Sequence, residues 1–353
     1  MQGMPVRGNS KKEKCIAPAQ EQRKIKGEIT MAYRILLPQP IMESGRKYLE
    51  EKGYEIIDGE GFTEEDIIRQ IPGCDAMIVR TAKITKKILD AADSLKVIAR
   101  HGAGFDGVDL KAADEKNVMV LYAPTANSNS VAETAIFYML YCSRNFKKVQ
   151  ALYQTDYMTA KMKIEKHELG GKTLGLIGVG NIGGLVAKKA AFGFDMNVIA
   201  YDPYAKELPD YIQRAESREE VFKNADYVSL HVPATPETEK SVGAKEFDLM
   251  KPTAFLINTS RGAVVDEEAL IEALKAGKIA GAGLDVLAKE PLDPENPLLS
   301  MDNVLTAPHI GGATKEASSR SSLVCAEGID DFLSGRRPKY PVPPMRAKLN
   351  GMR

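Results

Sequence analysis

The sequence lacks several features that would mark whole classes of protein. Its 353 residues carry no net charge at pH 7, because 48 Lys and Arg balance 48 Asp and Glu. No stretch reaches the roughly 18 uninterrupted apolar residues that a membrane-spanning helix needs. No segment is of low complexity, and none repeats at a solenoid period. These absences argue against a membrane protein, a repeat protein and a protein built mainly to coat nucleic acid or an anionic membrane.

Cysteine and histidine are also scarce, with four of each. The cysteines form no C-x-x-C pair, and the histidines form no H-x-x-H or H-E-x-x-H pair. We therefore expect no metal site. We expect the thiols to be buried or incidental ones in a reducing cytoplasm. The cysteines are Cys15, Cys74, Cys142 and Cys325, and the histidines are His101, His167, His231 and His309.

The balanced charge hides an uneven distribution. Residues 1–30 hold seven basic and three acidic residues, and residues 336–353 hold six basic residues and no acid. The stretch 31–335 keeps 35 basic and 45 acidic residues, a net charge of −10. Residues 1–30 resemble neither a secretory signal nor a transit peptide. We expect them to be a disordered extension, with Met31 as the natural start, and we expect the Pro-rich residues 338–353 to be an unstructured tail.

The length and the 44% of apolar residues predict two domains with sizeable cores. Two series of short apolar strands alternate with helical segments, which indicates an α/β fold of two Rossmann-like, doubly wound parallel-sheet domains with a cleft between them. Residues 31–126 plus 310–337 form the first predicted domain, and 127–309 form the second. A long apolar helix is expected from Val131 to about Leu152. The six strands expected in the second domain are Thr173–Ile177, Asn197–Tyr201, Tyr227–Leu230, Ala254–Asn258, Gly281–Val286 and Val304–Thr306.

A glycine-rich loop opens the second domain. Gly178, Gly180 and Gly183 form G-x-G-x-x-G between a predicted strand and a predicted helix. Gly178 permits a tight turn, Gly180 lets a pyrophosphate approach the backbone, and Gly183 allows close packing of helix and strand. Asp202 follows the next strand, where an acid binds the adenosine ribose and repels a 2′-phosphate. The pattern predicts an NAD site.

Three later segments each follow a strand of the second domain and carry one chemically active residue. They contain Arg261, Glu290 and His309, respectively. In open parallel sheets, ligands gather at the carboxyl ends of the strands. We therefore expect these three side chains to converge near a nicotinamide. His309 would exchange the proton of a hydroxyl or keto oxygen, Glu290 would hydrogen-bond and orient the imidazole, and Arg261 would bind a carboxylate with its planar fork.

The glycine loop, the three segments and Asn127-Ser128-Asn129-Ser130-Val131-Ala132-Glu133 together resemble the D-isomer-specific 2-hydroxyacid dehydrogenase family. The resemblance covers nearly all of residues 33–335. It implies a flavodoxin-like substrate domain, an NAD-binding domain, catalytic roles for Arg261, Glu290 and His309, and a cytoplasmic homodimer formed through the NAD-binding domain. Further cofactor contacts that it implies are Asn181, Ile182, Pro203, Val232, Pro233, Thr259, Asp285, Gly311 and Gly312.

The resemblance also implies where a 2-hydroxy or 2-keto acid binds. The loop with Ala103 and Gly104 offers free backbone N–H groups to a carboxylate. Arg80, Arg100 and Arg144 match positions that bind phosphate in the phosphoglycerate dehydrogenase branch, Arg144 acting across a dimer interface. This branch predicts 3-phosphoglycerate as the substrate. The loop after Arg80 is shorter than in that branch, and His101 stands where a small residue is common, so each departs from its pattern.

Other functions fit the same scaffold. Hydroxypyruvate and glyoxylate reductases are similar, and other 2-hydroxy acids remain open. Formate dehydrogenases share the fold but carry Gln where Glu290 stands. NAD-sensing corepressors retain the three catalytic residues, and only turnover separates them from the enzymes. The chain has no room for the C-terminal regulatory domain of many phosphoglycerate dehydrogenases, so serine feedback through such a domain is not expected.

Overall fold

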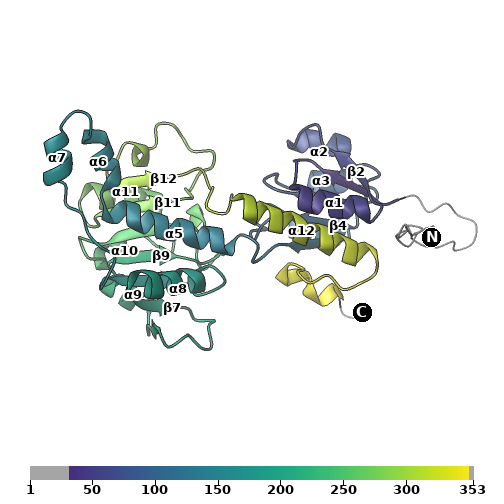
Figure 1. Cartoon of the computed structure of the whole chain (residues 1–353). Helices are drawn as coiled ribbons and strands as arrows, with labels where there is room; N and C mark the ends of the chain where they lie inside the picture. Colours follow the sequence, from purple (N-terminus) through teal and green to yellow (C-terminus); the bar gives the residue numbers. More distant parts are fainter. Residues whose placement is uncertain (1–31, 350–353) are drawn as a thin grey trace, which may run out of the picture. The chain divides into compact units, whose positions relative to one another are not determined.

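The computed structural model describes residues 32–349, which contain two parallel sheets (Figure 1). The predicted extension 1–30, with Met31 and Cys15, lies outside the described residues. The first sheet has the strand order β2-β1-β3-β4-β5, with every neighbouring pair parallel. This is the flavodoxin-like order. Its strands are β1 (Arg34–Leu37), β2 (Glu55–Asp58), β3 (Ala76–Val79), β4 (Val97–Arg100) and β5 (Met119–Tyr122).

Helices connect the strands of the first sheet, and two of them, α2 and α4, begin at a residue whose side chain caps the helix. Thr63 caps one of them: its side chain accepts from the Asp66 N–H, and the Asp66 side chain accepts from the Thr63 N–H. The two bonds form a reciprocal capping box. The connecting helices are α1 (Glu43–Glu51), α2 (Glu64–Gln70), α3 (Lys86–Ala91) and α4 (Leu110–Glu115). The last long helix, α12 (Lys315–Leu333), returns to pack on α1 and β4.

The second sheet has the order β12-β11-β10-β9-β6-β7-β8 and is also parallel throughout. Numbered from its first strand, β6, this is the Rossmann order 3-2-1-4-5-6 with one further strand. The predicted fold class is therefore confirmed, although β8 was not predicted. The strands are β6 (Thr173–Ile177), β7 (Asn197–Tyr201), β8 (Ile212–Arg214), β9 (Tyr227–Leu230), β10 (Phe255–Asn258), β11 (Gly281–Leu284) and β12 (Val304–Thr306).

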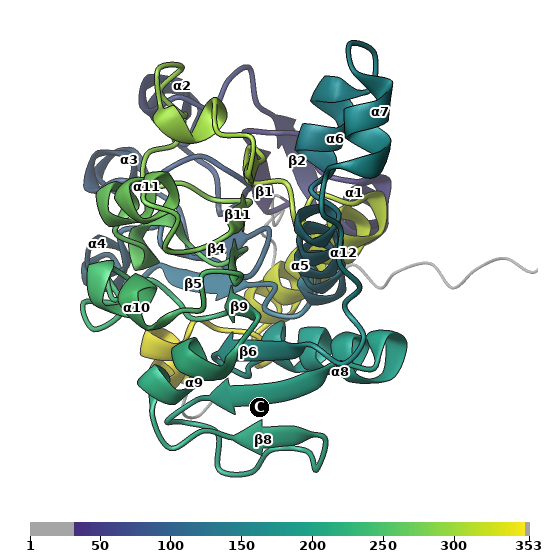
Figure 2. The same cartoon turned by 90° about the vertical axis from the view of Figure 1, so that its left-hand side faces the viewer.

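Helices cover both faces of the second sheet (Figure 2). The helices α5 (Ser128–Ser143) and α8 (Gly183–Phe194) pack on each other, and α5 also lies on β10 and β11. A Cβ at Gly283 of β11 would come within 2.8 Å of the Tyr138 ring, so glycine lets α5 lie flat on that strand. The other helices are α9 (Arg218–Asn224), α10 (Ala244–Leu249) and α11 (Glu267–Lys275).

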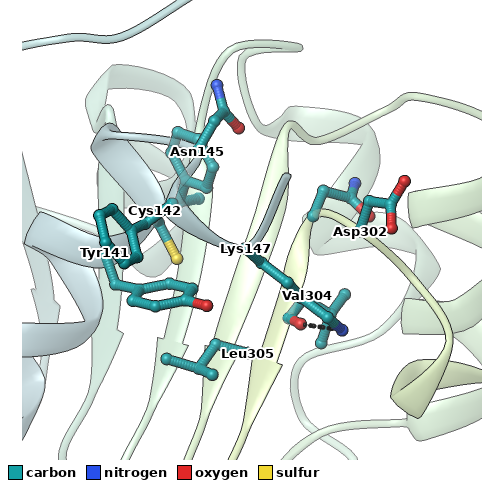
Figure 3. A pocket seen from close by; sticks show the side chains of 10 residues that line it. Tyr141, Cys142, Asn145, Lys147, Asp302, Val304 and Leu305 are labelled. Atoms are coloured by element: carbon teal, nitrogen blue, oxygen red, sulfur yellow. Dashed lines mark hydrogen bonds between the residues drawn. The ribbon is translucent and has the colours of Figure 1, made fainter. Parts of the chain in front are cut away.

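The prediction of one long helix over residues 131–152 is wrong in one respect, because the structure divides this segment into two helices. The first helix, α5, ends at Ser143, Asn145 adopts a left-handed conformation with φ of 46°, and α6 (Phe146–Leu152) follows, with α7 (Tyr157–Met162) after it. The break turns the chain so that Lys147 reaches the β12 end of the sheet. Its Nζ donates to the carbonyls of Leu299, Met301 and Val304 at 2.6–3.1 Å. Figure 3 shows the bond to Val304.

The expectation of an unstructured C-terminal tail is wrong for residues 338–349. Pro341 forms an antiparallel bridge with Leu121 of β5, and a 3₁₀ helix spans Pro343–Leu349. Val342, Met345 and Leu349 are fully or almost fully buried in the first core. The prediction weighed the prolines and overlooked these three apolar residues, which cover the edge strand β5 and satisfy its backbone groups.

Three further findings bear on the sequence predictions. Among residues 32–349, no helix is long and apolar enough to cross a membrane. The same residues contain no cluster of His, Cys, Asp and Glu that could hold a metal ion. Cys74, Cys142 and Cys325 are free and buried, as expected.

Candidate active site

The glycine loop joins β6 directly to α8. Gly178 has φ of 93°, and a Cβ on it would come within 2.7 Å of the His231 carbonyl oxygen. A Cβ on Gly183 would lie 2.2 Å from the carbonyl oxygen of Gly178. A Cβ on Gly180 would meet no atom within 4 Å. Gly178 thus makes the turn, Gly180 leaves the approach to the backbone open, and Gly183 allows close packing, as the motif predicts. The helix begins at Gly183, and its free N–H groups lie beside the open position.

Asp202 lies beside this loop at the end of β7. Its Oδ2 accepts from the Val179 N–H at 2.8 Å, and its Oδ1 accepts from the N–H groups of Tyr204 and Ala205 at 2.9 and 3.2 Å. The carboxylate is therefore fixed against the glycine loop and keeps lone pairs for further donors. Pro203 follows it, and Val232 and Pro233 follow β9, which pairs with β6 on the other side from β7, so these predicted cofactor residues belong to the same end of the sheet.

The segments after β10, β11 and β12 bring the three predicted catalytic residues to one edge of the second sheet. Nδ1 of His309 lies 3.0 Å from Oε2 of Glu290, and both side chains are about half exposed. His309 has φ of 54°, a left-handed conformation that non-glycine residues adopt at a cost. Arg261 follows β10 and donates from Nε to Oδ2 of Asp106 at 2.9 Å.

Asp285 holds the segment that carries His309. Its backbone oxygen accepts from the His309 N–H at 2.8 Å, and its carboxylate accepts from the N–H groups of Ile310 and Gly311 at 2.9 and 2.8 Å. Asp285 is only 2% exposed. Burial raises the pKa of this carboxyl, and the two N–H groups oppose that rise. The contacts fix the backbone on which His309 stands.

A cavity of about 500 Å³ lies against these residues. Segments that follow strands of both sheets line this cavity. Most of the predicted catalytic and substrate-binding residues are among them. The predicted residues that line it are Arg80, Arg100, Ala103, Gly104, Ile182, Thr259, Arg261, Asp285, Glu290, His309 and Gly312. Gly311 lies one residue away, bound to Asp285. Arg144 is not part of the cavity and is exposed between α5 and α6.

Comparisons with known proteins agree with this geometry. Residues 136–311 match the family model described as D-isomer specific 2-hydroxyacid dehydrogenase, NAD binding domain. The hydroxypyruvate reductase of Thermotoga maritima is 39% identical over 300 residues, which are 84% of this chain and 97% of that protein. The chain belongs to the D-isomer-specific 2-hydroxyacid dehydrogenase family. This is the family that the sequence resembles.

Two further relatives extend the comparison. The D-3-phosphoglycerate dehydrogenase of Methanocaldococcus jannaschii is 42% identical over 306 residues, which are 86% of this chain and 58% of that enzyme. The chain thus spans little more than half of that relative's length. The crystal structure of the NAD⁺-bound 3-phosphoglycerate dehydrogenase of Entamoeba histolytica superposes with a TM-score of 0.75 at 27% identity, covering 88% of this chain and 99% of that one.

The dehydrogenase site fits a dinucleotide on two observations of its own. The open position at Gly180 admits a group that any side chain would obstruct. In addition, the Oδ1 of Asn127 and the Oγ1 of Thr259 are buried polar atoms with no hydrogen-bond partner, and both residues line the cavity. Buried polar atoms without a partner are rare and indicate a missing polar ligand. The NAD-binding domain of the family is therefore present, and its glycine loop leaves space for the dinucleotide.

Three basic side chains, Arg80, Lys83 and Arg100, line the part of the cavity that the first sheet contributes. Arg80 donates to the carbonyl oxygen of Pro40 at 2.9 Å. Burial lowers the pKa of Arg100, and the nearby charges of Arg261 and Arg80 lower it further. His101 lies 2.9 Å from the Ser322 Oγ and 3.1 Å from the Ser318 carbonyl oxygen. Burial and the charge of Arg80 lower the pKa of His101 to about 4, so this imidazole is neutral at pH 7.

The sequence predictions missed four residues of this site. Lys83 and Asn127 line the cavity, and Asp106 pairs with Arg261. Asn258 ties the Arg261 turn, since its side chain donates to the Arg261 carbonyl and accepts from the Ser260 N–H and hydroxyl. Asn127 and Asp106 stand in segments that the sequence had already singled out, so their position was a usable signal. Asn258 likewise stands in the segment that carries Arg261, whereas for Lys83 the sequence offered no signal beyond proximity to Arg80.

Proposed function

We propose that this dehydrogenase is NAD-dependent and interconverts 3-phosphoglycerate and phosphohydroxypyruvate. The observation that carries the proposal is the charge of the cavity. Arg80, Lys83, Arg100 and Arg261 all line it, together with the carboxylates of Asp106, Asp285 and Glu290. Asp106 pairs with Arg261, Glu290 faces His309 and Asp285 binds backbone N–H groups, so the charges of Arg80, Lys83 and Arg100 are the ones in surplus. One carboxylate needs one guanidinium, and the surplus positive charge suits a substrate that also carries a phosphate. The surplus is local, because residues 31–335 have a net charge of −10.

The proposed chemistry assigns one task to each catalytic side chain. When bound, NAD would supply the acceptor for the hydride that leaves C2 of the hydroxy acid. Because Nδ1 of His309 faces Glu290, its Nε2 takes the hydroxyl proton in oxidation and returns a proton to the keto oxygen in reduction. Glu290 fixes the ring orientation and balances the imidazolium charge. Arg261 holds the substrate carboxylate and draws electron density from the adjacent carbonyl.

The preference for NAD over NADP rests on Asp202. Its carboxylate is fixed beside the glycine loop by three backbone N–H groups, where it suits ribose hydroxyls and repels a 2′-phosphate. Asp202→Asn keeps the side-chain shape and removes the charge. We expect its kcat/KM with NADPH to rise about tenfold relative to NADH, the ratio that 1.4 kcal/mol produces. Asp210→Asn, at an exposed position eight residues on, is the control and should leave the ratio unchanged.

A second substrate is favoured by one finding. The hydroxypyruvate reductase of Thermotoga maritima matches this chain over 97% of its own length, whereas the phosphoglycerate dehydrogenase of Methanocaldococcus jannaschii matches over 58%. Hydroxypyruvate has the same carboxylate and keto group but no phosphate. In that case Arg80 and Lys83 would have no anion to bind, which is why we place hydroxypyruvate second.

Initial rates of NADH oxidation decide between these functions. The panel comprises phosphohydroxypyruvate, hydroxypyruvate, glyoxylate, pyruvate and 2-ketoisocaproate. We expect the highest kcat/KM with phosphohydroxypyruvate. A higher value with hydroxypyruvate or glyoxylate would transfer the assignment to the reductases. Binding of NADH without turnover of any of the five would favour an NAD-sensing protein instead.

We also propose a cytoplasmic homodimer formed through α5, α6 and α7. These helices carry large side chains that are about half exposed or more: Phe137, Phe146, Tyr153, Tyr157, Met158 and Met162. Such a concentration of exposed apolar groups is typical of an interface. Arg144 lies between α5 and α6 and would reach the partner's cavity from there. Light scattering on the full chain should give twice the chain mass, and Met158→Glu with Met162→Glu should shift it towards the monomer.

A further inference from the structure

Two of the three nitrogen atoms of the Arg261 guanidinium donate hydrogen bonds within the protein. Nε donates to Oδ2 of Asp106 at 2.9 Å, and Nη1 donates to the Ser260 carbonyl oxygen at 2.7 Å. Nη2 packs against Gly104, where a Cβ would lie only 1.9 Å from it. The turn at Ser260 and the small residue at position 104 thus fix the plane of the guanidinium. Among residues 32–349, Asp106 is the only ion-pair partner of Arg261.

The two members of this ion pair come from different sheets. Asp106 lies in the loop between β4 of the first sheet and α4, whereas Arg261 follows β10 of the second sheet. Both side chains line the cavity, and Asp106 is 53% exposed. The pair is therefore reached by solvent and by any anion that enters the cavity.

The carboxylate of Asp106 and that of a substrate would compete for the same donors of Arg261. A guanidinium binds a carboxylate best through two parallel N–H donors, and the edge formed by Nε and Nη2 is one of its two-donor edges. Nη1 is already engaged by the protein backbone, so the Nε edge is the one left for a substrate. Asp106 occupies that edge at Nε. A substrate carboxylate can take both donors only after Asp106 has moved away.

We propose that Asp106 sets the substrate affinity by competing with the substrate carboxylate for Arg261. This inference rests on the proposed function, because it takes Arg261 as the carboxylate-binding residue. Asp106 is an affinity-setting residue and takes no part in hydride or proton transfer. Each binding event exchanges the Asp106 carboxylate for that of the substrate on the same guanidinium. Removing the charge of Asp106 consequently strengthens binding and leaves the chemical step unchanged.

The expected size of the effect follows from the exposure of the pair. Solvent-exposed ion pairs are weak, and their measured strengths correspond to affinity changes of about two- to fivefold. In Asp106→Asn we expect KM for phosphohydroxypyruvate and hydroxypyruvate to fall about two- to fivefold, with kcat unchanged. Asp106→Glu keeps the charge and should restore KM towards the original value. Asp248→Asn removes an equally exposed carboxylate outside the cavity and should change neither parameter.

A binding measurement tests the proposal without turnover. Malonate, a simple dicarboxylate, is titrated into the NAD-loaded full chain, and we expect about two- to fivefold tighter binding to Asp106→Asn than to the unsubstituted protein. Equal affinities would overturn the proposal. A lower kcat or a higher KM in Asp106→Asn would also overturn it, because Asp106 would then hold Arg261 in its productive position. Absence of turnover in the unsubstituted protein contradicts the proposed function, yet the malonate affinities still decide the role of Asp106.

Discussion

Nδ1 of His309 lies 3.0 Å from Oε2 of Glu290, although the two residues follow different strands and are 19 positions apart. The contact assigns the two ring nitrogens. Nδ1 serves the carboxylate and Nε2 remains for a substrate proton. Asp285 hydrogen-bonds the backbone around His309, and His309 itself has a left-handed backbone conformation. The backbone that carries the ring is therefore fixed as well. Two predictions follow from this arrangement.

Replacement of His309 by Ala should remove the proton donor and acceptor. We expect kcat to fall about 10²- to 10⁴-fold, the range that positioned acid–base catalysis contributes. NADH binding, followed by fluorescence titration, should remain nearly unchanged because the glycine loop and Asp202 are untouched. His167→Ala is the matched control, since this histidine lies outside the cavity. Retained turnover in His309→Ala would remove His309 from the mechanism.

Replacement of Glu290 by Gln keeps a hydrogen-bond partner for Nδ1 and removes the charge opposite the ring. We expect kcat for keto-acid reduction to fall about 10²-fold, with KM little changed, because the imidazolium that donates the proton loses its counter-charge. Glu295→Gln changes an exposed residue of the same segment and should have no effect. A large rise in KM with unchanged kcat would mean that Glu290 contacts the substrate rather than His309.

Much of this site could be predicted because its signals are local. The strand, the glycine loop and the first turn of α8 are contiguous, and each glycine answers one steric demand of that short segment. Likewise, Arg261, Glu290 and His309 each follow a strand closely, and the parallel order β12-β11-β10 then brings their segments to one edge. The alternation of strands and helices was sufficient to predict parallel sheets.

What the sequence did not predict depends on tertiary contacts. The Asp106–Arg261 pair joins residues 155 positions apart, and no short pattern encodes it. The helix break at Asn145 lies in a stretch without Pro or Gly, and it is accompanied by the contact of Lys147 with three distant carbonyls. In residues 338–349, the prolines led to the prediction of an unstructured tail. The three apolar side chains that contradict it have partners in β5, over 200 positions away in the sequence.

Charge reversal at Arg80 tests whether the cationic cavity binds phosphate. In Arg80→Glu we expect KM for phosphohydroxypyruvate to rise about 10- to 100-fold, since a hydrogen bond to a charged group contributes about 1.5–3 kcal/mol. The KM for glyoxylate, which carries no phosphate, should stay within about twofold. Arg69→Glu reverses a charge that is 71% exposed on α2 and is the control. An equal loss with both substrates would show that Arg80 does not distinguish them by phosphate.

The last prediction concerns stability in acid and rests on His231, which follows β9 beside Gly178. Its Nε2 lies 2.9 Å from the Ser229 Oγ, and its buried Nδ1 has no partner among the described residues. Burial lowers the pKa of His231 from 6.5 to about 4. Between pH 6.5 and about 4, His231 binds a proton in the unfolded chain but stays neutral in the folded chain. Stability should therefore fall as the pH drops below about 6.5, by at most about 1.4 kcal/mol per pH unit for one such site.

His231→Gln removes this titration. Urea unfolding at pH 7 and pH 5 should show a smaller loss of stability for His231→Gln than for the unsubstituted chain. Part of the loss should remain in the variant, because the pKa of His101 is lowered to about 4 as well and acts in the same pH window. His167→Gln, at a partly exposed position, is the control and should retain the full acid loss. An identical loss in His231→Gln and the unsubstituted chain would contradict the prediction, because it would mean that His231 is protonated equally easily in the folded and unfolded states.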